Sequence, residues 1–450
     1  MKRKIYERML DWKKTSKGKT AILIDGARRV GKSYIAEEFA RNEYRSYILI
    51  DFFKVDDDVK ELFNHYLNDL DAFFQSLSAI YGKKLYERES LIIFDEVQFF
   101  PRARAAIKYL VADGRYDYIE TGSLMSIKEN VSNILIPSEE RHFKLYPMDF
   151  EEFLWALNDE TLMPVIKSCF EQKKPMGQAV HRKALTRFRE YLIVGGMPQA
   201  VKEYVDTHDF DAVDAVKRDI LTLYREDIMK HARNYAYKVE RIFDEIPSQL
   251  SKHEKKFVLA SLGSGARFRE YENAFMWLED AMIVNICWNS TEPNIGLKLN
   301  RDNATMKIYM ADTGLLISHA FDENGLTSNE IYKKILLGKL EVNEGMIFEN
   351  IVAQMFATSG HKLYFYSNPS REDKDLRMEI DFLLSKSKIT SRHNVSPVEV
   401  KSGKRYTFSS LKKFRQQYKE QLHTAYILHV DDLKVADDIV YLPVYMAGLL

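Results

Sequence analysis

Cysteine is nearly absent from the sequence: Cys169 and Cys287 are the only two among 450 residues. Two cysteines so far apart exclude a disulfide scaffold and a zinc site built from cysteines. We interpret both as small, buried apolar residues and expect a reducing, cytoplasmic environment.

Long apolar runs and an excess of one charge are also missing. No window approaches the roughly 18 uninterrupted apolar residues that a membrane helix needs, and the basic N-terminal stretch lacks the apolar segment of a signal peptide. We therefore expect a soluble protein with no membrane partner. The 66 Lys and Arg residues balance 66 Asp and Glu residues. This balance excludes a globally basic nucleic-acid binder, although local basic patches remain possible.

Hydrophobic residues make up 46% of the chain and aromatic residues 12%, which is enough for buried cores. At about 150 residues per domain, the length favours about three domains. The hydrophobic patterning predicts an α/β protein in four regions. They are an α/β core over 1–150, a helical region over 151–239, a mixed unit over 240–335 and a second α/β domain over 336–450.

The first region alternates short apolar runs with helical patterns. Residues 33–41 predict a helix, with Ile35, Ala36, Phe39 and Ala40 on one face. The expected strands are 21–24, 47–51, 91–94, 116–120 and 142–146. Nearly continuous apolar strands separated by helices are typical of a parallel sheet that is covered on both faces.

Between the first expected strand and the first expected helix, the chain reads GARRVGKS, which matches G-x-x-x-x-G-K-[ST] in full. Its glycines let the backbone fold closely around phosphates, while the helix N-terminus attracts the anion. Arg28 and Arg29 either contact phosphates or are solvated. The predicted nucleotide-binding residues are Gly26, Ala27, Arg28, Arg29, Val30, Gly31, Lys32, Ser33 and Tyr34.

The chemistry expected at this loop is ATP binding with Mg²⁺. Lys32 supplies positive charge to the outer phosphates, and the Ser33 hydroxyl is a hard ligand for Mg²⁺. Asp95 follows the apolar run LIIF and is expected to hold Mg²⁺ through water, while Glu96 polarises the attacking water. The catalytic set is completed by Thr121 or Ser123, which end another strand and are placed to hydrogen-bond the γ-phosphate or the water.

These stretches, together with LYPMDFEEFL, YLIVGGMP, KIYMADTGLL, GMIFEN and VEVKSGK, resemble the prokaryotic AAA-type ATPases that carry a conserved C-terminal region of unknown function. The resemblance implies an AAA-type P-loop ATPase core, a winged-helix-like unit over 240–335 and a nuclease-like domain over 336–450. It also makes Arg141 a candidate arginine finger that acts on a neighbouring subunit's nucleotide. The alternative for Arg141 is an ordinary surface ion pair.

A second acidic constellation lies in the last region. Asp381 enters an apolar strand, and strand alternation puts Glu399 and Lys401 on one face of another. Glu349, on the preceding helix, adds a carboxylate. Such a hard oxygen set suits Mg²⁺, with Lys401 orienting the nucleophile, and the pattern resembles the PD-(D/E)xK nuclease fold. The alternative is a structural carboxylate–lysine cluster in a domain without activity.

The distribution of charged residues gives arguments both for and against contact with nucleic acid. Basic residues that are suited to a phosphate backbone follow the second acidic motif, namely Lys401, Lys404, Arg405, Lys412, Lys413 and Arg415. The expected helix over 267–280 is instead acidic, so protein contact explains it as well as DNA contact. Two functions therefore stay open. One is an ATPase that couples nucleotide state to DNA binding or Mg²⁺-dependent cleavage, and the other is a nucleotide-controlled binding switch or assembly protein with an inactive nuclease-like domain.

Overall fold

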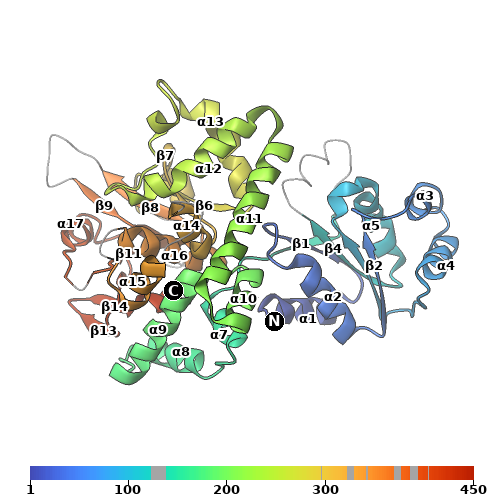
Figure 1. The fold of residues 1–450 in the computed structure, drawn as a ribbon, viewed down its shortest axis with the longest axis horizontal. Coiled ribbons are helices and arrows are strands. Elements are labelled where there is room, and N and C mark those ends of the chain that lie inside the picture. Colours follow the sequence, from blue (N-terminus) through green and yellow to red (C-terminus); the bar gives the residue numbers. More distant parts are fainter. Residues whose placement is uncertain are drawn as a thin grey trace. The chain divides into compact units, whose positions relative to one another are not determined.

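The computed structural model describes residues 1–122, 138–294, 296–321, 329–340, 343–368, 377–385, 394–403 and 405–450. Ser123 and Lys404 of the predicted sites lie outside these residues. The chain forms two compact units, the first chiefly Met1–Tyr146 and the second chiefly Pro147–Glu279 with Ile283–Leu450 (Figure 1). The α/β class is confirmed. The finer division of the second unit into three regions stays a prediction.

A five-stranded parallel sheet forms the first unit, with the strand order β2-β3-β4-β1-β5. Its strands are β1 (Ala21–Asp25), β2 (Ser46–Asp51), β3 (Ser90–Asp95), β4 (Asp117–Gly122) and β5 (Glu140–Lys144). The parallel sheet and all five strands were predicted. The last strand begins and ends two residues earlier than expected.

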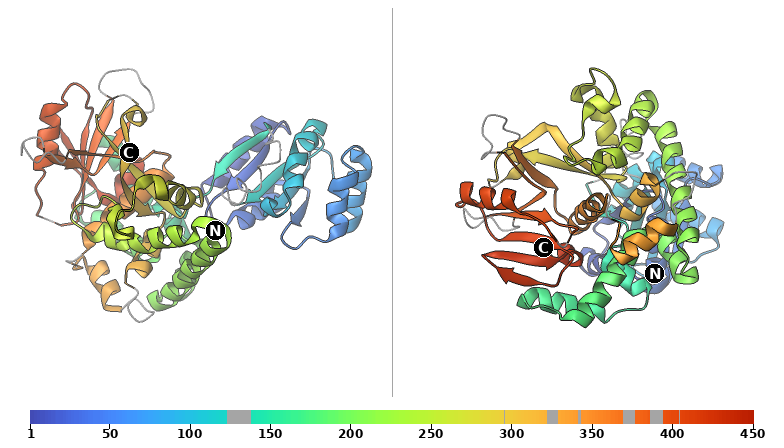
Figure 2. Two further views of the ribbon diagram at one scale, coloured as in Figure 1. Left: turned by 90° about the horizontal axis from the view of Figure 1, so that it is seen from above. Right: turned by 60° about the vertical axis from the view of Figure 1, so that its left-hand side comes forward.

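Alternation along the strands divides the core between the two faces of this sheet (Figure 2). Ile22 and Ile24 pack with the helices α1 (Ile5–Ser16) and α2 (Lys32–Glu43). On the other face, Leu23 joins the cluster formed with α3 (Asp57–His65), α4 (Leu70–Tyr81) and α5 (Pro101–Asp113). Burying each large apolar side chain contributes about 1.5–3 kcal/mol, so both faces must be covered for the sheet to be stable.

The second unit opens with helices. These are α7 (Phe150–Ala156), α8 (Leu162–Gln172), α9 (Gln178–Val194), α10 (Pro198–Thr207), α11 (Phe210–His231), α12 (Ala236–Ser251) and α13 (Phe268–Asp280). The apolar face of α13 is buried, because Tyr271, Ala274, Phe275 and Leu278 all lie in the core.

Two mixed sheets follow. The first has the order β7-β6-β8-β9 and the second β10-β11-β12-β14-β13. Their strands are β6 (Val284–Ser290), β7 (Arg301–Met310), β8 (Tyr364–Asn368), β9 (Met378–Ile380), β10 (Phe382–Ser385), β11 (Val395–Val400), β12 (Ala425–His429), β13 (Lys434–Ala436) and β14 (Ile439–Pro443). The helices among them are α14 (Thr313–Ala320), α15 (Asn329–Leu337), α16 (Glu344–Thr358) and α17 (Ser409–Gln417).

The single apolar strand that we expected Asp381 to enter is two strands in the structure. The chain breaks at Asp381, so that β9 pairs with β8 in one sheet and β10 pairs with β11 in the other. The Asp381 carboxylate accepts a hydrogen bond from the Val400 backbone N–H at 2.8 Å, which ties this corner to the end of β11. Asp381 therefore stands where the two sheets meet.

A buried turn holds the helices of the second unit to its sheets. Asp312 caps α14 through the Leu315 N–H, and its other oxygen accepts the Gly196 N–H at 2.6 Å. Space at this turn is tight, because a Cβ on Gly196 would lie 2.1 Å from the Met148 carbonyl oxygen. Asp312 is 1% exposed, so removing its partners would leave a buried carboxylate unsatisfied.

None of the helices in the described part of the chain combines the length and the apolarity that crossing a bilayer requires.

We predict that Gly196→Ala lowers the free energy of unfolding of the second unit by more than about 2 kcal/mol, because the new methyl group overlaps backbone atoms. The matched control is Gly345→Ala in α16, where a Cβ reaches only the Ser402 hydroxyl at 4.0 Å. Thermal unfolding followed by circular dichroism measures both variants. Equal melting temperatures for the two would contradict the steric role of Gly196.

Candidate functional sites

The loop between β1 and α2 has the geometry of a phosphate cradle. Gly26 has no room for a side chain, since a Cβ there would lie 2.4 Å from the Leu145 carbonyl oxygen. Gly31, the N-cap of α2, has φ 95°, a left-handed conformation that favours glycine. Both glycines of the motif are thus required by the backbone, and the loop leads directly into the N-terminus of a 12-residue helix.

Lys32 folds back over this loop. Its amino group donates to the carbonyl oxygens of Gly26 and Ala27, each at 3.1 Å. Burial lowers the pKa of Lys32, while the nearby carboxylates of Glu96 and Asp95 act in the opposite direction. The ammonium therefore lies within the cradle, where phosphate oxygens are able to replace the two carbonyl oxygens.

A chain of polar contacts connects this loop with the end of β3. The Ser33 hydroxyl donates to Asp95 Oδ1 at 2.7 Å, and the Thr121 hydroxyl donates to the same oxygen. Thr121 Oγ1 also accepts the Glu96 backbone N–H at 3.2 Å. The contact is possible because β4 lies between β1 and β3, so that Thr121 ends its strand beside both partners.

Glu96 follows Asp95 in a left-handed backbone conformation with φ 53°, which is uncommon for a residue other than glycine and is often found at functional sites. The Gln98 side-chain amide donates to its carboxylate. The hydrogen bond from Gln98 thus holds the Glu96 carboxylate within this turn.

The remaining predicted residues of the nucleotide site differ in exposure. Val30 is fully buried, whereas Arg28 and Arg29 are exposed. The Tyr34 side chain is 56% exposed, and its hydroxyl accepts a hydrogen bond from the amino group of Met1. Arg141 is exposed on the edge strand β5, in register with Ile22.

Sequence reasoning missed two residues beside the loop. Arg3 donates to the carbonyl oxygens of Val30 at 3.1 Å and Tyr146 at 2.6 Å, and so fastens the loop to the end of β5. Asp25, directly before Gly26, is 1% exposed, and one of its oxygens has no partner. Burial raises the pKa of Asp25. The apolar run AILI that ends in Asp was a signal for a carboxylate at this edge of the sheet.

The donor set at the loop fits Mg²⁺. A serine hydroxyl and one carboxylate, 2.7 Å apart, are hard oxygen ligands, and Mg²⁺ in phosphate sites typically takes one or two such ligands beside phosphate oxygens and water. Ser33 and Asp95 are the residues that would hold it.

The second acidic constellation is assembled at the corner formed by Asp381. Lys401 pairs with Glu399 at 2.6 Å, which confirms that the two side chains share one face of the chain. Glu349 lies on α16, near enough to Asp381 for the two charges to interact. Burial, and after it the negative charge of Glu349, raises the pKa of Asp381. The predicted residues are therefore neighbours in the structure.

One unpredicted residue changes this site. Lys307 on β7 places its ammonium 2.9 Å from Glu349 Oε1, 2.8 Å from Glu379 Oε1 and 3.9 Å from Asp381 Oδ1. A second lysine, Lys255, contacts the other oxygen of Glu349 at 2.5 Å. Sequence reasoning missed Lys307 because it belongs to a distant strand, although a lysine within the run KIYM is a signal for a buried partner.

The electrostatics agree with this pairing. Burial by itself raises the pKa of Glu349, but the ammonium groups of Lys255 and Lys307 outweigh it and bring the pKa to about 2. Burial, followed by the charge of Asp381, raises the pKa of Glu399 to about 8, and Glu399 Oε1 has no hydrogen-bond partner.

Two observations bear on the predicted Mg²⁺ ligand set of Glu349, Asp381 and Glu399, which stays a prediction. Within the described residues, no group of three or more His, Cys, Asp or Glu side chains is arranged to hold a metal ion. The space between Glu349 and Asp381 contains the Lys307 ammonium instead. As they stand, these residues do not fit a divalent cation.

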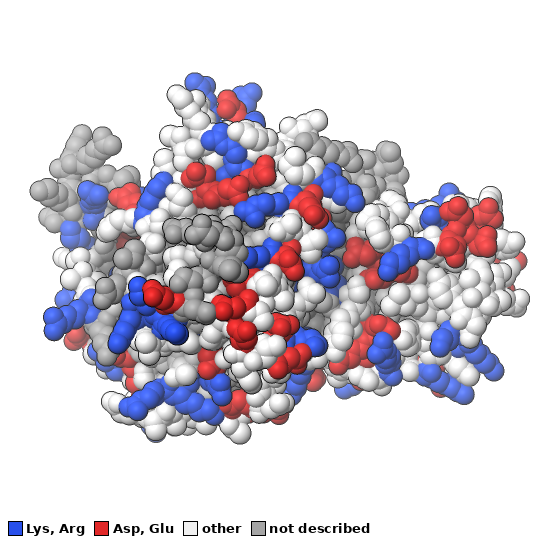
Figure 3. All heavy atoms as spheres, viewed as in Figure 1, with Lys and Arg blue, Asp and Glu red and all other residues white. Residues whose placement is uncertain are grey.

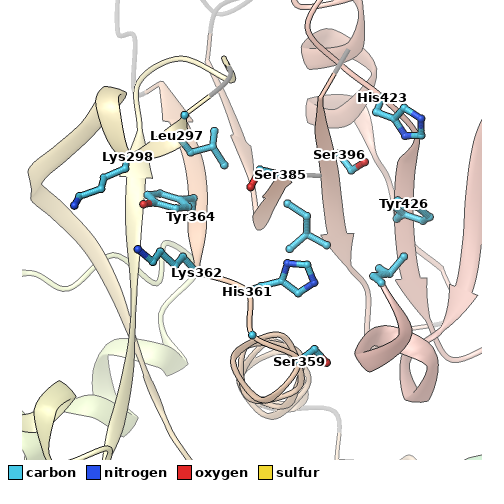
Figure 4. Close-up of a pocket in the computed structure, with 14 residues that line it drawn as sticks. Leu297, Lys298, Ser359, His361, Lys362, Tyr364, Ser385, Ser396, His423 and Tyr426 are labelled. Carbon is cyan, nitrogen blue, oxygen red and sulfur yellow. The ribbon is translucent and has the colours of Figure 1, made fainter. Parts of the chain in front are cut away.

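A cavity of about 740 Å³ lies elsewhere in the second unit, near the start of β8 and the end of β10. Its lining includes Lys298, Lys362, Tyr364, Ser385 and Ser396. In the view of Figure 4, both lysine amino groups lie beyond Tyr364, on the side away from the two serines. The charged groups do not converge on the hydroxyl groups, so we assign no ligand to this cavity.

The parallel sheet and the phosphate cradle define the first unit as a P-loop nucleotide-binding domain. In agreement, residues 18–154 match a family model described as an AAA domain. This part of the chain is therefore similar to AAA domains. Two further models, both described as domains of unknown function, match residues 185–326 (DUF8612) and 344–446 (DUF4143).

Similarity to individual proteins is more distant. An uncharacterized protein of Methanocaldococcus jannaschii is 25% identical over 195 residues, which cover 41% of this chain and 39% of that relative. The match thus spans well under half of the relative's length. The crystal structure of a DNA replication initiation factor aligns with 62% of this chain and 95% of its own, at 12% identity and a TM-score of 0.20, a score too low to support an argument.

Proposed function

We propose that the protein hydrolyses ATP at the cradle formed by residues 26–33, with Mg²⁺ held by Ser33 and Asp95. The observation that carries this proposal is the shared hydrogen bonding of Ser33 and Thr121 to Asp95 Oδ1, because it joins the phosphate loop to the end of β3. A loop that served only as a structural turn would need no such contact with a distant strand.

Each residue has a part in this reaction. Lys32 exchanges its carbonyl partners for phosphate oxygens and offsets the charge that develops in the transition state. Bound Mg²⁺ supplies further positive charge to the phosphates. Glu96 accepts a hydrogen bond from the attacking water and orients it, while Thr121 holds the Asp95 carboxylate and the Glu96 backbone in place.

We predict that Lys32→Ala and Glu96→Gln both lower ATP turnover, on the order of a hundredfold or more, for different reasons. Lys32→Ala weakens nucleotide binding, whereas Glu96→Gln leaves binding intact because it removes only the group that orients water. Phosphate release and the binding of a fluorescent ATP analogue measure the two effects. Lys19→Ala is the matched control, and normal turnover by the Lys32→Ala protein would contradict the site.

Arg141 is our candidate for a residue that acts on the nucleotide of a second copy of the chain. It lies exposed on an edge strand, where another molecule is able to reach it. A guanidinium beside the γ-phosphate stabilises the transition state, and such fingers increase turnover by about 10³–10⁵.

We predict that Arg141→Ala lowers turnover strongly and that adding the Glu96→Gln protein restores it, because the second protein donates Arg141 to the intact site of the first. Phosphate release from the mixture, over a range of protein concentrations, measures this complementation. The exposed Arg45, replaced by Ala, provides the control. A mixture no more active than its separate components argues for an ordinary surface arginine.

We propose as a second function that the C-terminal region binds nucleic acid without cleaving it and that bound ATP or ADP changes the affinity. Helix α17 buries Leu411 and Phe414 and exposes Lys412, and Arg405, four residues before the helix, is exposed as well. On the face of the molecule in Figure 3, basic and acidic side chains are interspersed. This distribution favours contact through a local patch over a broad basic surface.

For this patch, we predict that the double variant Arg405→Ala/Lys412→Ala weakens DNA binding and flattens its salt dependence. Each lost phosphate contact reduces the slope of log K against log salt by about 0.9 for duplex DNA. Fluorescence anisotropy in ATP and in ADP, at several salt concentrations, measures both effects, with Lys202→Ala as the surface control. Binding that is unchanged by the substitutions, or identical in both nucleotides, contradicts this function.

A further inference from the structure

We propose that Lys307 is a built-in cation that takes the place of a divalent metal ion in the carboxylate cluster of the C-terminal region. In consequence, this cluster binds no Mg²⁺ and does not activate water for phosphodiester cleavage. The proposal concerns a site separate from the ATP site and does not depend on ATP hydrolysis.

The position of the ammonium carries the inference. Lys307 Nζ lies at hydrogen-bond distance from Glu349 of α16 and Glu379 of β9, and 3.9 Å from Asp381, which directly follows β9. A Mg²⁺ ion binds its oxygen ligands at 2.0–2.1 Å and needs near-octahedral space around it. Because an ion bound to Glu349 Oε1 and facing Asp381 would take the space of the ammonium, the two cations exclude each other.

Lys307 is also held where it is. Its side chain is 1% exposed, and it projects from the middle of β7, where it stands in register with Cys287 of β6. The ring of Phe365 lies beneath the ammonium, 5.0 Å away. If the buried ammonium moved away from these carboxylates, buried charges would lose their partners, which is costly.

Other oxygens of Glu349 and Asp381 are engaged as well, whereas Glu399 Oε1 has no hydrogen-bond partner. Glu349 Oε2 contacts Lys255, and Glu349 Oε1 also accepts the Tyr309 hydroxyl at 2.5 Å. Asp381 Oδ2 accepts the Val400 N–H. A metal ion would therefore have to replace several partners of two carboxylates at once, whereas at the ATP site it exchanges only with hydroxyl hydrogens.

The test is Mn²⁺ binding to the full chain, followed by electron paramagnetic resonance in the absence of nucleotide. The Asp95→Asn background removes the carboxylate ligand of the ATP site, so failure of the ATPase proposal does not affect the result. With Lys307 intact, we expect no Asp381-dependent binding of Mn²⁺ at Mn²⁺ concentrations up to about 1 mM. Replacing Lys307 by the uncharged Met, which has similar length, is expected to create a site that binds at least tenfold more tightly and that Asp381→Asn abolishes.

Two outcomes overturn the proposal. The first is that the protein with intact Lys307 binds Mn²⁺, or cleaves plasmid DNA with Mg²⁺, and that Asp381→Asn abolishes this binding or cleavage. This comparison does not require the Lys307 variant to fold. The second is a Lys307→Met protein that is folded by circular dichroism yet binds no Mn²⁺. The matched control is Lys255→Met, which removes the cation paired with Glu349 Oε2 and is expected to leave the Lys307 ammonium, and hence the exclusion of Mn²⁺, in place.

Discussion

The order of strands in the first unit is the constraint on which its site depends. Ser33 follows β1 and Asp95 ends β3, yet these strands are not neighbours, because β4 lies between them. Strand neighbours are about 4.8 Å apart, so β1 and β3 are two spacings apart, and the loop after β1 brings Ser33 to the end of β3. Thr121, at the end of β4, fills the gap and binds the same carboxylate oxygen. Both hydroxyl groups donate to Asp95, and its carboxylate oxygens are of the hard type that Mg²⁺ prefers.

In the second unit, the buried carboxylates have partners of a different kind. There, Glu349 is paired with two ammonium groups, since an isolated buried charge costs several kcal/mol. A hydroxyl group beside a carboxylate can turn its hydrogen elsewhere when a metal ion arrives, but a buried lysine brings a full positive charge that cannot leave easily. Two clusters with similar acidic residues therefore differ in the cations that they accept, and the difference lies in the partners of the carboxylates.

Whether a contact could be predicted from the sequence depends on how far apart its two residues lie along the chain. The phosphate loop was predictable because its parts are consecutive and its flanking elements have clear periodicity. Likewise, the shared face of Glu399 and Lys401 follows from alternation within one strand. Lys307 was not predictable in the same way, since it reaches Glu349 across 42 residues and from a strand assigned to another region. The break at Asp381 depends on its bond to Val400, which no local pattern reveals.

If Lys307 excludes a metal ion, the energy of ATP hydrolysis has no cleavage step in the C-terminal region to control. What remains is an equilibrium between binding states, and a nucleotide shifts such an equilibrium only by its differential affinity for the two states. A tenfold change in partner affinity requires about 1.4 kcal/mol of such a difference. Contacts that respond to the γ-phosphate at Lys32 and Thr121 are sufficient in strength for this, because a single charge-assisted hydrogen bond contributes about 1.5–3 kcal/mol. Contacts with ATP at the phosphate loop are therefore strong enough to drive a binding switch, without any chemistry at the second acidic cluster.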